Sequence, residues 1–232
     1  KKKKKIRILE PSVGVGNFIP LLFEKYKEKD EVIIDVCDID NNSLNVLKTI
    51  LAKYKVPKNF KLNFKNTDFL LWSTKLKYDI VVGNPPYKKL TKNKELLERY
   101  KFGLHNTDTN NLFSFFIEKS IRLGDYTSLI VPKSLLNSPE FDRTRELLKN
   151  QGLKKICDYG EKAFKGVKIE TVSFLVSSKQ NIEPSNEIII ESFIDNSYSE
   201  KKKDYILSDD FPYWLIYRND KFDKIASKMK LD

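Results

Sequence analysis

The stretch Tyr78-Asp79-Ile80-Val81-Val82-Gly83-Asn84-Pro85-Pro86-Tyr87 places a rigid polar turn directly after a short apolar segment. Its β-branched run is typical of a strand buried on both faces of a sheet. Each proline fixes its own φ and keeps the preceding residue extended, so the Asn84 side chain and the Pro85 carbonyl are predicted to project from the strand's carboxyl end. Ligands bind at that edge in open α/β sheets. An ordinary Asn-Pro turn is the alternative.

Upstream, a glycine-containing loop lies between an expected strand and an expected helix. The strand is Ile6–Glu10 and the loop is Pro11-Ser12-Val13-Gly14-Val15-Gly16-Asn17-Phe18, in which Asn17 is expected to cap the helix. Strand, glycine loop and helix together open a nucleotide-binding unit, because glycine lets the backbone approach a ligand. The loop lacks the third glycine of the dinucleotide fingerprint and the Lys-Ser/Thr ending of a P-loop. Neither NAD nor ATP is therefore favoured.

Acidic residues follow the next two expected strands. Residues 31–37 predict a strand that ends at Asp38, where an acid usually holds the ribose hydroxyls of a bound nucleotide. A helix capped by residues 41–43 is expected next, and then a third strand over residues 61–64. Asp68-Phe69 follows that strand and fits adenine contacts, by hydrogen bond and by packing. The pair fits a turn former and a core aromatic equally well.

The remaining chain continues the alternation of strands and helices. A polar, lysine-rich loop is predicted over 88–109, a length typical of functional or mobile loops. The alternation predicts a mostly parallel sheet with helices on both faces. Beyond Ser177 the aromatic run at 211–217 fits either a strand that packs back on the sheet or the stub of another domain. The other expected elements are helices at 111–121 and 138–148, strands at 126–131, 153–159, 171–176 and 188–190, and a charged tip at 199–203.

Composition limits the partners and the compartment. The 232 residues suffice for one substantial domain, or for one domain with an appendage. A balance of 43 Lys+Arg against 32 Asp+Glu, net +11, suits a polyanion such as nucleic acid or an anionic membrane surface, although a lysine-rich genome would give the same bias. Cys37 and Cys157 lie in apolar runs and are expected to be buried core thiols in a reducing compartment. The single histidine, His105, argues against a catalytic triad and a histidine-based metal site. No apolar run is long enough for a membrane span and no signal-peptide core follows the first lysines, so a cytoplasmic protein is expected.

The motifs in this order resemble those of the adenine-N6 DNA methyltransferases of restriction-modification systems, which use S-adenosyl-L-methionine. The resemblance rests on Glu10–Phe18 and Asn84–Tyr87, with Asp38 and Asp68 between them, and it extends over about residues 6–178. The order is the cofactor-first order of the family's gamma group. The resemblance implies a Rossmann-like class I methyltransferase fold with a mostly parallel, seven-stranded sheet. It also implies a catalytic domain over 1–178, and a C-terminal extension or the start of a target-recognition region over 179–232.

The resemblance also implies a cofactor site and a catalytic centre. The chain departs from the family at Glu10, Val13 and Val15, and Val15 is expected to leave less room in the loop. The implied catalytic residues are Asn84, Pro85, Pro86, Tyr87 and Phe164. The implied S-adenosylmethionine-binding residues are Glu10, Pro11, Ser12, Gly14, Gly16, Asn17, Phe18, Asp38, Ile39, Asp68, Phe69 and Asn84.

Chemistry explains why such a turn would serve. The amino group of adenine is a poor nucleophile, because its lone pair is delocalised into the ring. If Asn84 Oδ1 and the Pro85 carbonyl accept its two hydrogens, the lone pair is freed to point at the methyl group, and positioning supplies most of the catalysis. Tyr87 and Phe164 would stack on the extruded base, although Phe164 also fits a core aromatic. The implied partners are duplex DNA and a separate specificity domain or restriction subunit.

Two other functions fit parts of the sequence. A protein glutamine-N5 or RNA methyltransferase is one, because the Asn-Pro-Pro-Tyr turn grips any planar amide or amino nitrogen, but the glutamine enzymes would not need Phe164 or the basic loop. The other is a DNA-binding module with a decayed cofactor site, for which Val13 and Val15 are the signal. Cytosine-N4 methylation uses the same chemistry, with Ser more often in place of Asn84.

Overall fold

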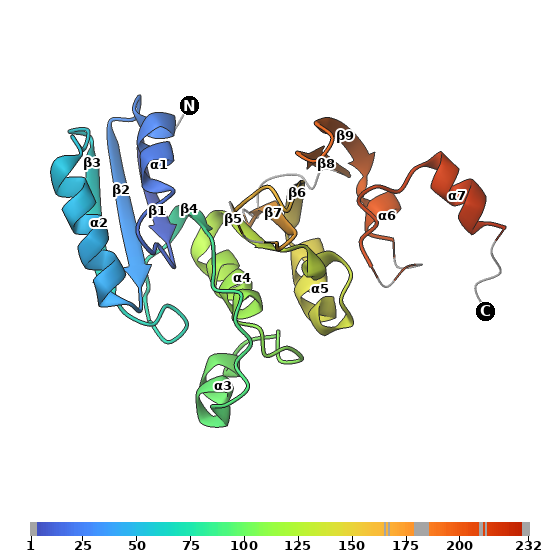
Figure 1. Cartoon of the computed structure of the whole chain (residues 1–232), viewed down its shortest axis with the longest axis horizontal. Helices are drawn as coiled ribbons and strands as arrows, with labels where there is room; N and C mark the ends of the chain where they lie inside the picture. Colours follow the sequence, from blue (N-terminus) through green and yellow to red (C-terminus); the bar gives the residue numbers. More distant parts are fainter. Residues whose placement is uncertain are drawn as a thin grey trace.

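A nine-stranded sheet with the order β3-β2-β1-β4-β5-β7-β6-β8-β9 runs through the structure, a computed structural model (Figure 1). The structure describes residues 4–164, 166, 168–178, 186–208, 211 and 213–228. The strands are β1 Lys5–Glu10, β2 Glu31–Asp38, β3 Phe60–Asn66, β4 Tyr78–Gly83, β5 Gly124–Pro132, β6 Gly152–Gly160, β7 Thr171–Ser177, β8 Glu187–Ser192 and β9 Ser197–Lys202.

The sheet is mostly parallel, as predicted, but it has nine strands and not seven. β7 is antiparallel to both β5 and β6, so β6 points the same way as β4 and β5. β8 then pairs parallel to β6, and β9 pairs antiparallel to β8. The expected count was wrong because β6 offers a free edge, which β8 covers while it buries Ile188 and Ile190 in the core.

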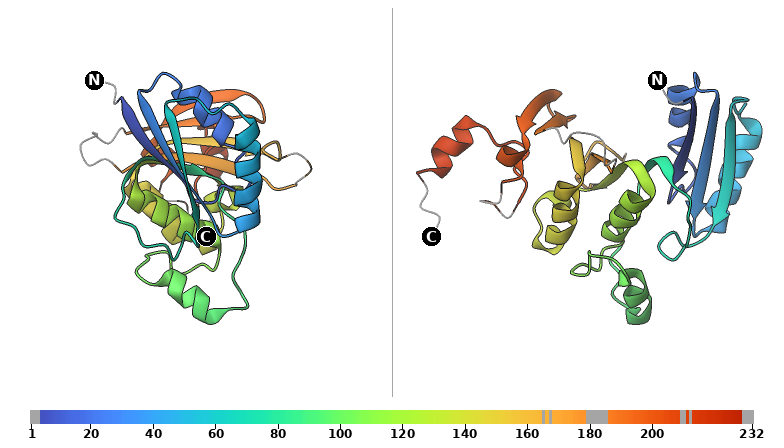
Figure 2. Two further views of the ribbon diagram at one scale, coloured as in Figure 1. Left: turned by 90° about the vertical axis from the view of Figure 1, so that its left-hand side faces the viewer. Right: turned by 180° about the vertical axis from the view of Figure 1, so that it is seen from behind.

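Helices cover both faces of the sheet, as predicted; in the left view of Figure 2, α2 lies on one side and α4 and α5 lie on the other. The helices are α1 Ile19–Tyr26, α2 Asn41–Lys53, α3 Lys94–Lys101, α4 Leu112–Leu123, α5 Asp142–Asn150, α6 Lys203–Ile206 and α7 Asp220–Ala226, with short 3-10 turns η1 Lys133–Leu136 and η2 Pro139–Phe141. None of these described helices has the length and apolar character needed to cross a membrane.

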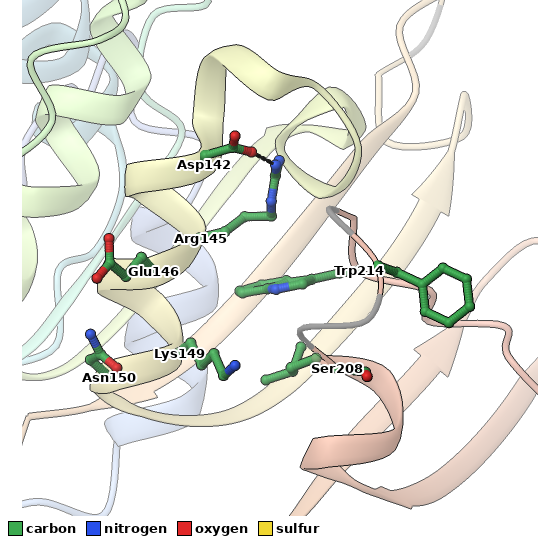
Figure 3. A pocket seen from close by; sticks show the side chains of 9 residues that line it. Asp142, Arg145, Glu146, Lys149, Asn150, Ser208 and Trp214 are labelled. Atoms are coloured by element: carbon green, nitrogen blue, oxygen red, sulfur yellow. Dashed lines mark hydrogen bonds and ion pairs between the residues drawn. The ribbon is translucent and has the colours of Figure 1, made fainter. Parts of the chain in front are cut away.

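Two large apolar cores hold the layers together. The first lies between β1–β3 and the α1–α2 face, and the second between β5–β8 and the α4–α5 face. Trp214 and Ile216 enter the second core, and the backbone N–H of Trp214 donates to the Leu136 carbonyl (2.9 Å). Figure 3 shows Trp214 beside α5, where Arg145 pairs with Asp142. The aromatic run therefore packs back on the molecule without forming a strand in its described residues.

Several local predictions were wrong at the ends of elements. Asn17 does not cap α1, because tight turns at Gly16 and Ile19 shift the helix start and leave Phe18 at the capping position without a side-chain bond. Asp40 caps α2 in place of residues 41–43, by accepting two backbone N–H groups. The long polar loop contains α3, and the charged tip belongs mainly to β9.

Polar sequence hid these last two elements, because neither shows the apolar periodicity of a helix or strand: β9 pairs with the neighbouring β8, and α3 is held by packing of Leu97 and Tyr100 with Phe115. Cys37 is buried as expected, whereas Cys157 is only half-buried, with its Sγ 3.5 Å from Glu191 Oε2.

Candidate active site

A cavity of about 250 Å³ lies at the carboxyl edge of the sheet, where β1, β2 and β4 end. Parallel strands bring the residues that follow them to one edge, which is how positions far apart in sequence meet here. The lining residues are Pro11, Ser12, Gly14, Asp38, Ile39, Asp68, Phe69, Leu70, Asn84, Pro86, Tyr100, Leu112 and Phe116. Most of the residues predicted from the sequence therefore share one cavity.

The glycine loop forms one wall of the cavity. Gly14 and Gly16 have φ values of +53° and +87°, in a backbone region that residues other than glycine rarely adopt. A methyl group on Gly16 would lie 2.4 Å from Leu47 Cδ1, whereas one on Gly14 would meet no atom within 4 Å. The two glycines thus have different tasks, close packing against α2 at Gly16 and an open cradle at Gly14.

The two valines of the loop do not enter this cradle. Val13 is buried in the first core, and its N–H donates to the Cys37 carbonyl (2.9 Å). Val15 is 44% exposed and is not among the lining residues. The expected narrowing of the loop by Val15 is therefore not found.

Asp38 links the glycine loop after β1 to the turn after β2 by hydrogen bonds. Its Oδ2 accepts the Gly14 N–H (2.8 Å) and its Oδ1 accepts the Asp40 N–H (2.9 Å). A carboxylate offers about four lone-pair positions, so further hydrogen bonds can be accepted from the cavity. Ile39, which is 70% exposed, adds an apolar surface beside this acid.

Asp68 and Phe69 combine the two roles that the sequence left open. Asp68 is a turn former, because its Oδ1 accepts the Leu70 N–H (2.9 Å), and it also lines the cavity. Phe69 is a core aromatic, 5.0 Å from the Phe116 ring centroid, and it too lines the cavity. Tyr100, which the sequence analysis missed within a polar segment, donates its hydroxyl to Asp68 Oδ2 (2.6 Å).

Glu10 lies at the end of β1, fully buried and close to Asp38. Its Oε2 has no hydrogen-bond partner among the described residues. Burial, together with the negative charge of Asp38, raises the pKa of Glu10 well above its usual value. Glu10 is not among the residues that line the cavity. Among the described residues, no cation or donor satisfies the Oε2 atom of this buried acid.

We expect Glu10→Gln to weaken the pH dependence of stability. Because the folded state keeps the Glu10 proton to a higher pH than the unfolded state, the free energy of unfolding falls as pH rises above the ordinary pKa of a glutamic acid. Glu10→Gln has no proton to lose, so its free energy of unfolding should exceed that of wild type by an amount that grows between pH 5 and pH 8, by at most about 1.4 kcal/mol per pH unit. Urea unfolding of the ligand-free protein at both pH values measures the gain. Exposed Glu24→Gln is the control, and equal slopes for wild type and Glu10→Gln would contradict the assignment.

The Asn-Pro-Pro-Tyr turn forms the part of the cavity wall next to the glycine loop. Asn84 and Pro86 line the cavity, and Asn84 Oδ1 is buried without a hydrogen-bond partner among the described residues. Ser12 Oγ donates to the Asn84 carbonyl (2.9 Å) and so ties the turn to the glycine loop. A strong acceptor is thus held unpaired at the cavity, an arrangement that is costly unless a ligand supplies the donor.

The two aromatic residues of the predicted site lie outside the cavity lining. Tyr87 donates its hydroxyl to the Ile130 carbonyl (3.0 Å) near the end of β5, and burial raises the pKa of its phenol. Phe164 is half-buried in the segment that follows β6, whose carboxyl end lies at the same edge as that of β4. Both residues therefore follow strands that end at the carboxyl edge of the sheet, but neither lines the cavity. Leu112 and Phe116, which do line it, are four residues apart on α4, a helical spacing that could have predicted their shared face.

The strand order, the antiparallel β7 and the cavity beside the first glycine loop define a class I methyltransferase fold. A putative class I S-adenosylmethionine-dependent methyltransferase from Listeria monocytogenes has a similar structure, with a TM-score of 0.68 and 18% identity over 83% of this chain and 59% of that one. More particularly, the chain belongs to the Eco57I restriction-modification methylase family, whose model matches residues 15–164.

Named relatives agree with this family. Modification methylase CviBIII of Paramecium bursaria Chlorella virus NC1A is 25% identical over 209 residues, which cover 89% of this chain and 48% of the relative. Type II methyltransferase M.HincII of Haemophilus influenzae is 29% identical over 202 residues, covering 82% and 36%. The chain therefore spans about half or less of the length of these curated relatives.

Proposed function

We propose that this chain is the catalytic part of a DNA methyltransferase of a restriction-modification system. It would transfer a methyl group from S-adenosylmethionine to the exocyclic N6 of an adenine that has left the duplex. The observation that carries the proposal is that Asn84, whose Oδ1 is buried and has no hydrogen-bond partner among the described residues, lines the same cavity as Gly14 and Asp38. A nucleotide-type cradle and an acceptor for an amino group thus lie side by side.

The residues present fit the cofactor. Gly14 leaves an open cradle, Asp38 can accept the ribose hydroxyls, and Ile39 offers an apolar face for the adenine. Asp68 and Phe69 would hold the far edge of that adenine by hydrogen bond and packing. The bound cofactor supplies an electrophilic methyl group on a sulfonium, which is an excellent leaving group.

The turn would then activate the acceptor nitrogen. Asn84 Oδ1 and the Pro85 carbonyl accept the two amino hydrogens and push the nitrogen toward tetrahedral geometry. The Ser12 bond and the two prolines fix both acceptors before the base arrives, so no reorganisation is needed during transfer. Tyr87, held by Ile130, and Phe164 would stack on the base, and such stacking is worth about 1–3 kcal/mol per base. That gain offsets the few kcal/mol that extrusion of the base costs.

Radiolabelled methyl transfer by the full-length protein tests the proposal. The labelled cofactor is offered with unmodified plasmid DNA, RNA and protein, and the product is digested and identified chromatographically. We expect label in DNA as N6-methyladenine. Label in cytosine would overturn the base assignment, and label in RNA or on a glutamine amide would support the alternative methyltransferase classes.

We expect Asp38→Ala to raise the dissociation constant for S-adenosylmethionine roughly 10–100-fold, the loss of hydrogen bonds to a charged group. Titration calorimetry measures the constant. Asp40→Ala is a matched control, because Asp40 caps α2 but does not line the cavity. An unchanged constant in Asp38→Ala would point to another ribose ligand.

We assign residues 1–178 to the catalytic domain and 179–232 to an extension or the start of a target-recognition region. In support, β7 ends at Ser177, and the elements beyond it lie along the edge of the sheet next to β6. Recognition of the DNA sequence would then fall to a further domain, or to a separate specificity or restriction subunit.

A further inference from the structure

Phe102 is 90% exposed, more than any other large hydrophobic residue in the described parts of the chain. It follows the last residue of α3 and precedes Gly103, whose φ of +74° makes a sharp turn with open space around it. The phenylalanine ring therefore stands at the tip of a turn. Neighbouring apolar residues behave differently, since Leu97 and Tyr100 are buried against Phe115.

The turn that carries Phe102 is firmly anchored. The Leu104 N–H donates to the Lys101 carbonyl (3.0 Å) and closes the turn. The next residue, His105, donates its N–H to both carboxylate oxygens of Glu118 (2.9 and 3.0 Å). Glu118 is a buried residue of α4, 1% exposed, so the anchor lies in the body of the molecule. The exposure of Phe102 is thus built into the structure.

The position and charge of this element indicate its partner. Figure 1 shows α3 beyond the arrowheads of β1 and β2, on the side of the carboxyl edge. Tyr100, two residues before Phe102, lines the cavity and contacts Asp68. Residues 88–102 contain six basic and two acidic side chains. An exposed aromatic ring within a basic segment beside the reactive cavity matches a polyanion with stacked rings, which is duplex DNA.

We propose that Phe102 is a wedge that inserts into the base stack next to the target base, while the basic side chains of residues 88–102 hold the adjacent phosphates. Apolar wedges of this kind unstack and kink a duplex. Insertion here would lower the cost of extruding the base toward Asn84 and would fill part of the space that it leaves. The proposal rests on the proposed function and adds a site outside the cavity.

The test compares Phe102→Ala with wild type in the full-length protein, on two unmethylated duplexes that carry the sequence that the protein methylates. In one the target base is paired, and in the other it faces an abasic position, so that extrusion costs less. We expect Phe102→Ala to lower kcat/KM roughly 10–100-fold on the paired duplex, the worth of one stacking contact. The loss should shrink several-fold on the abasic duplex, and Phe102→Trp should restore most of the activity. A 2-aminopurine at the target position should show weaker fluorescence enhancement with Phe102→Ala.

Controls separate this proposal from the proposed function. Leu21→Ala changes a 65% exposed apolar residue on α1 and should leave both duplexes unaffected. Absence of DNA methylation by wild type would overturn the proposed function itself. If wild type methylates DNA and Phe102→Ala has the same kcat/KM on the paired duplex, only the wedge proposal would be overturned. An equal loss on both duplexes, with a lowered melting temperature, would show that another part of the full-length chain covers Phe102, which also overturns the wedge.

Discussion

Asn84→Ala is expected to abolish measurable methyl transfer, a loss of ~10³-fold in kcat, which is the scale seen when one preorganised polar group is removed from a reaction centre. The physical reason is that Oδ1 is the buried acceptor that no other described residue satisfies, so alanine leaves the amino group without half of its activation. Affinity for S-adenosylmethionine should change little, because Gly14 and Asp38, which we expect to hold the cofactor, remain in the cavity wall. Initial rates at saturating cofactor and calorimetry measure the two quantities separately.

A remote amide supplies the control for this experiment. Asn59 donates its side-chain N–H groups to the Lys27 and Lys29 carbonyls, far from the Asn-Pro-Pro-Tyr turn, so Asn59→Ala should keep full activity at a modest cost in stability. Retained turnover in Asn84→Ala would remove Asn84 from the reaction. A parallel loss of cofactor affinity would instead make Asn84 mainly a binding residue.

Gly16→Ala is expected to destabilise the protein by about 2–4 kcal/mol, the sum of a left-handed backbone strain and of overpacking in a core. The added methyl would lie 2.4 Å from Leu47 Cδ1, and Leu47 belongs to the buried core beneath α2. Part of the cost is relieved if the Leu47 side chain moves. Urea unfolding of the ligand-free protein gives the free energy of unfolding directly.

Gly14→Ala is the matched variant in the same loop. Its methyl group would meet no atom within 4 Å, so only the strain at φ +53° remains, about 1–2 kcal/mol. Gly14 lines the cavity, so its added methyl group would meet the bound cofactor. The loss in binding free energy for S-adenosylmethionine should therefore exceed the loss in free energy of unfolding. If Gly14→Ala were the less stable of the two, or if it bound the cofactor as wild type does, the division of tasks between the glycines would be wrong.

Local sequence predicted the parts of the site that depend on backbone geometry. A β-branched strand ending in two prolines, and glycines placed after a strand, leave the chain few conformations, so the turn and the loop follow from residues close together. The same reasoning was wrong about Asn17, because the turns closed by the Gly16 and Ile19 N–H groups move the start of α1 by one residue. It also missed Tyr100, since a polar segment gives no sign that one of its residues reaches Asp68.

The sequence by itself determined the mostly parallel sheet, the glycine loop, the acid at the end of the second strand and the Asn-Pro-Pro-Tyr turn, because each is encoded by the dihedral limits and hydrophobic pattern of neighbouring residues. Only the tertiary structure decided that the described residues form a sheet of nine strands, that none of them satisfies the buried Asn84 Oδ1, and that Phe102 stands exposed on an anchored turn. Burial and hydrogen-bond satisfaction depend on which distant segments meet. Local sequence does not specify that when the partners are dozens of residues away.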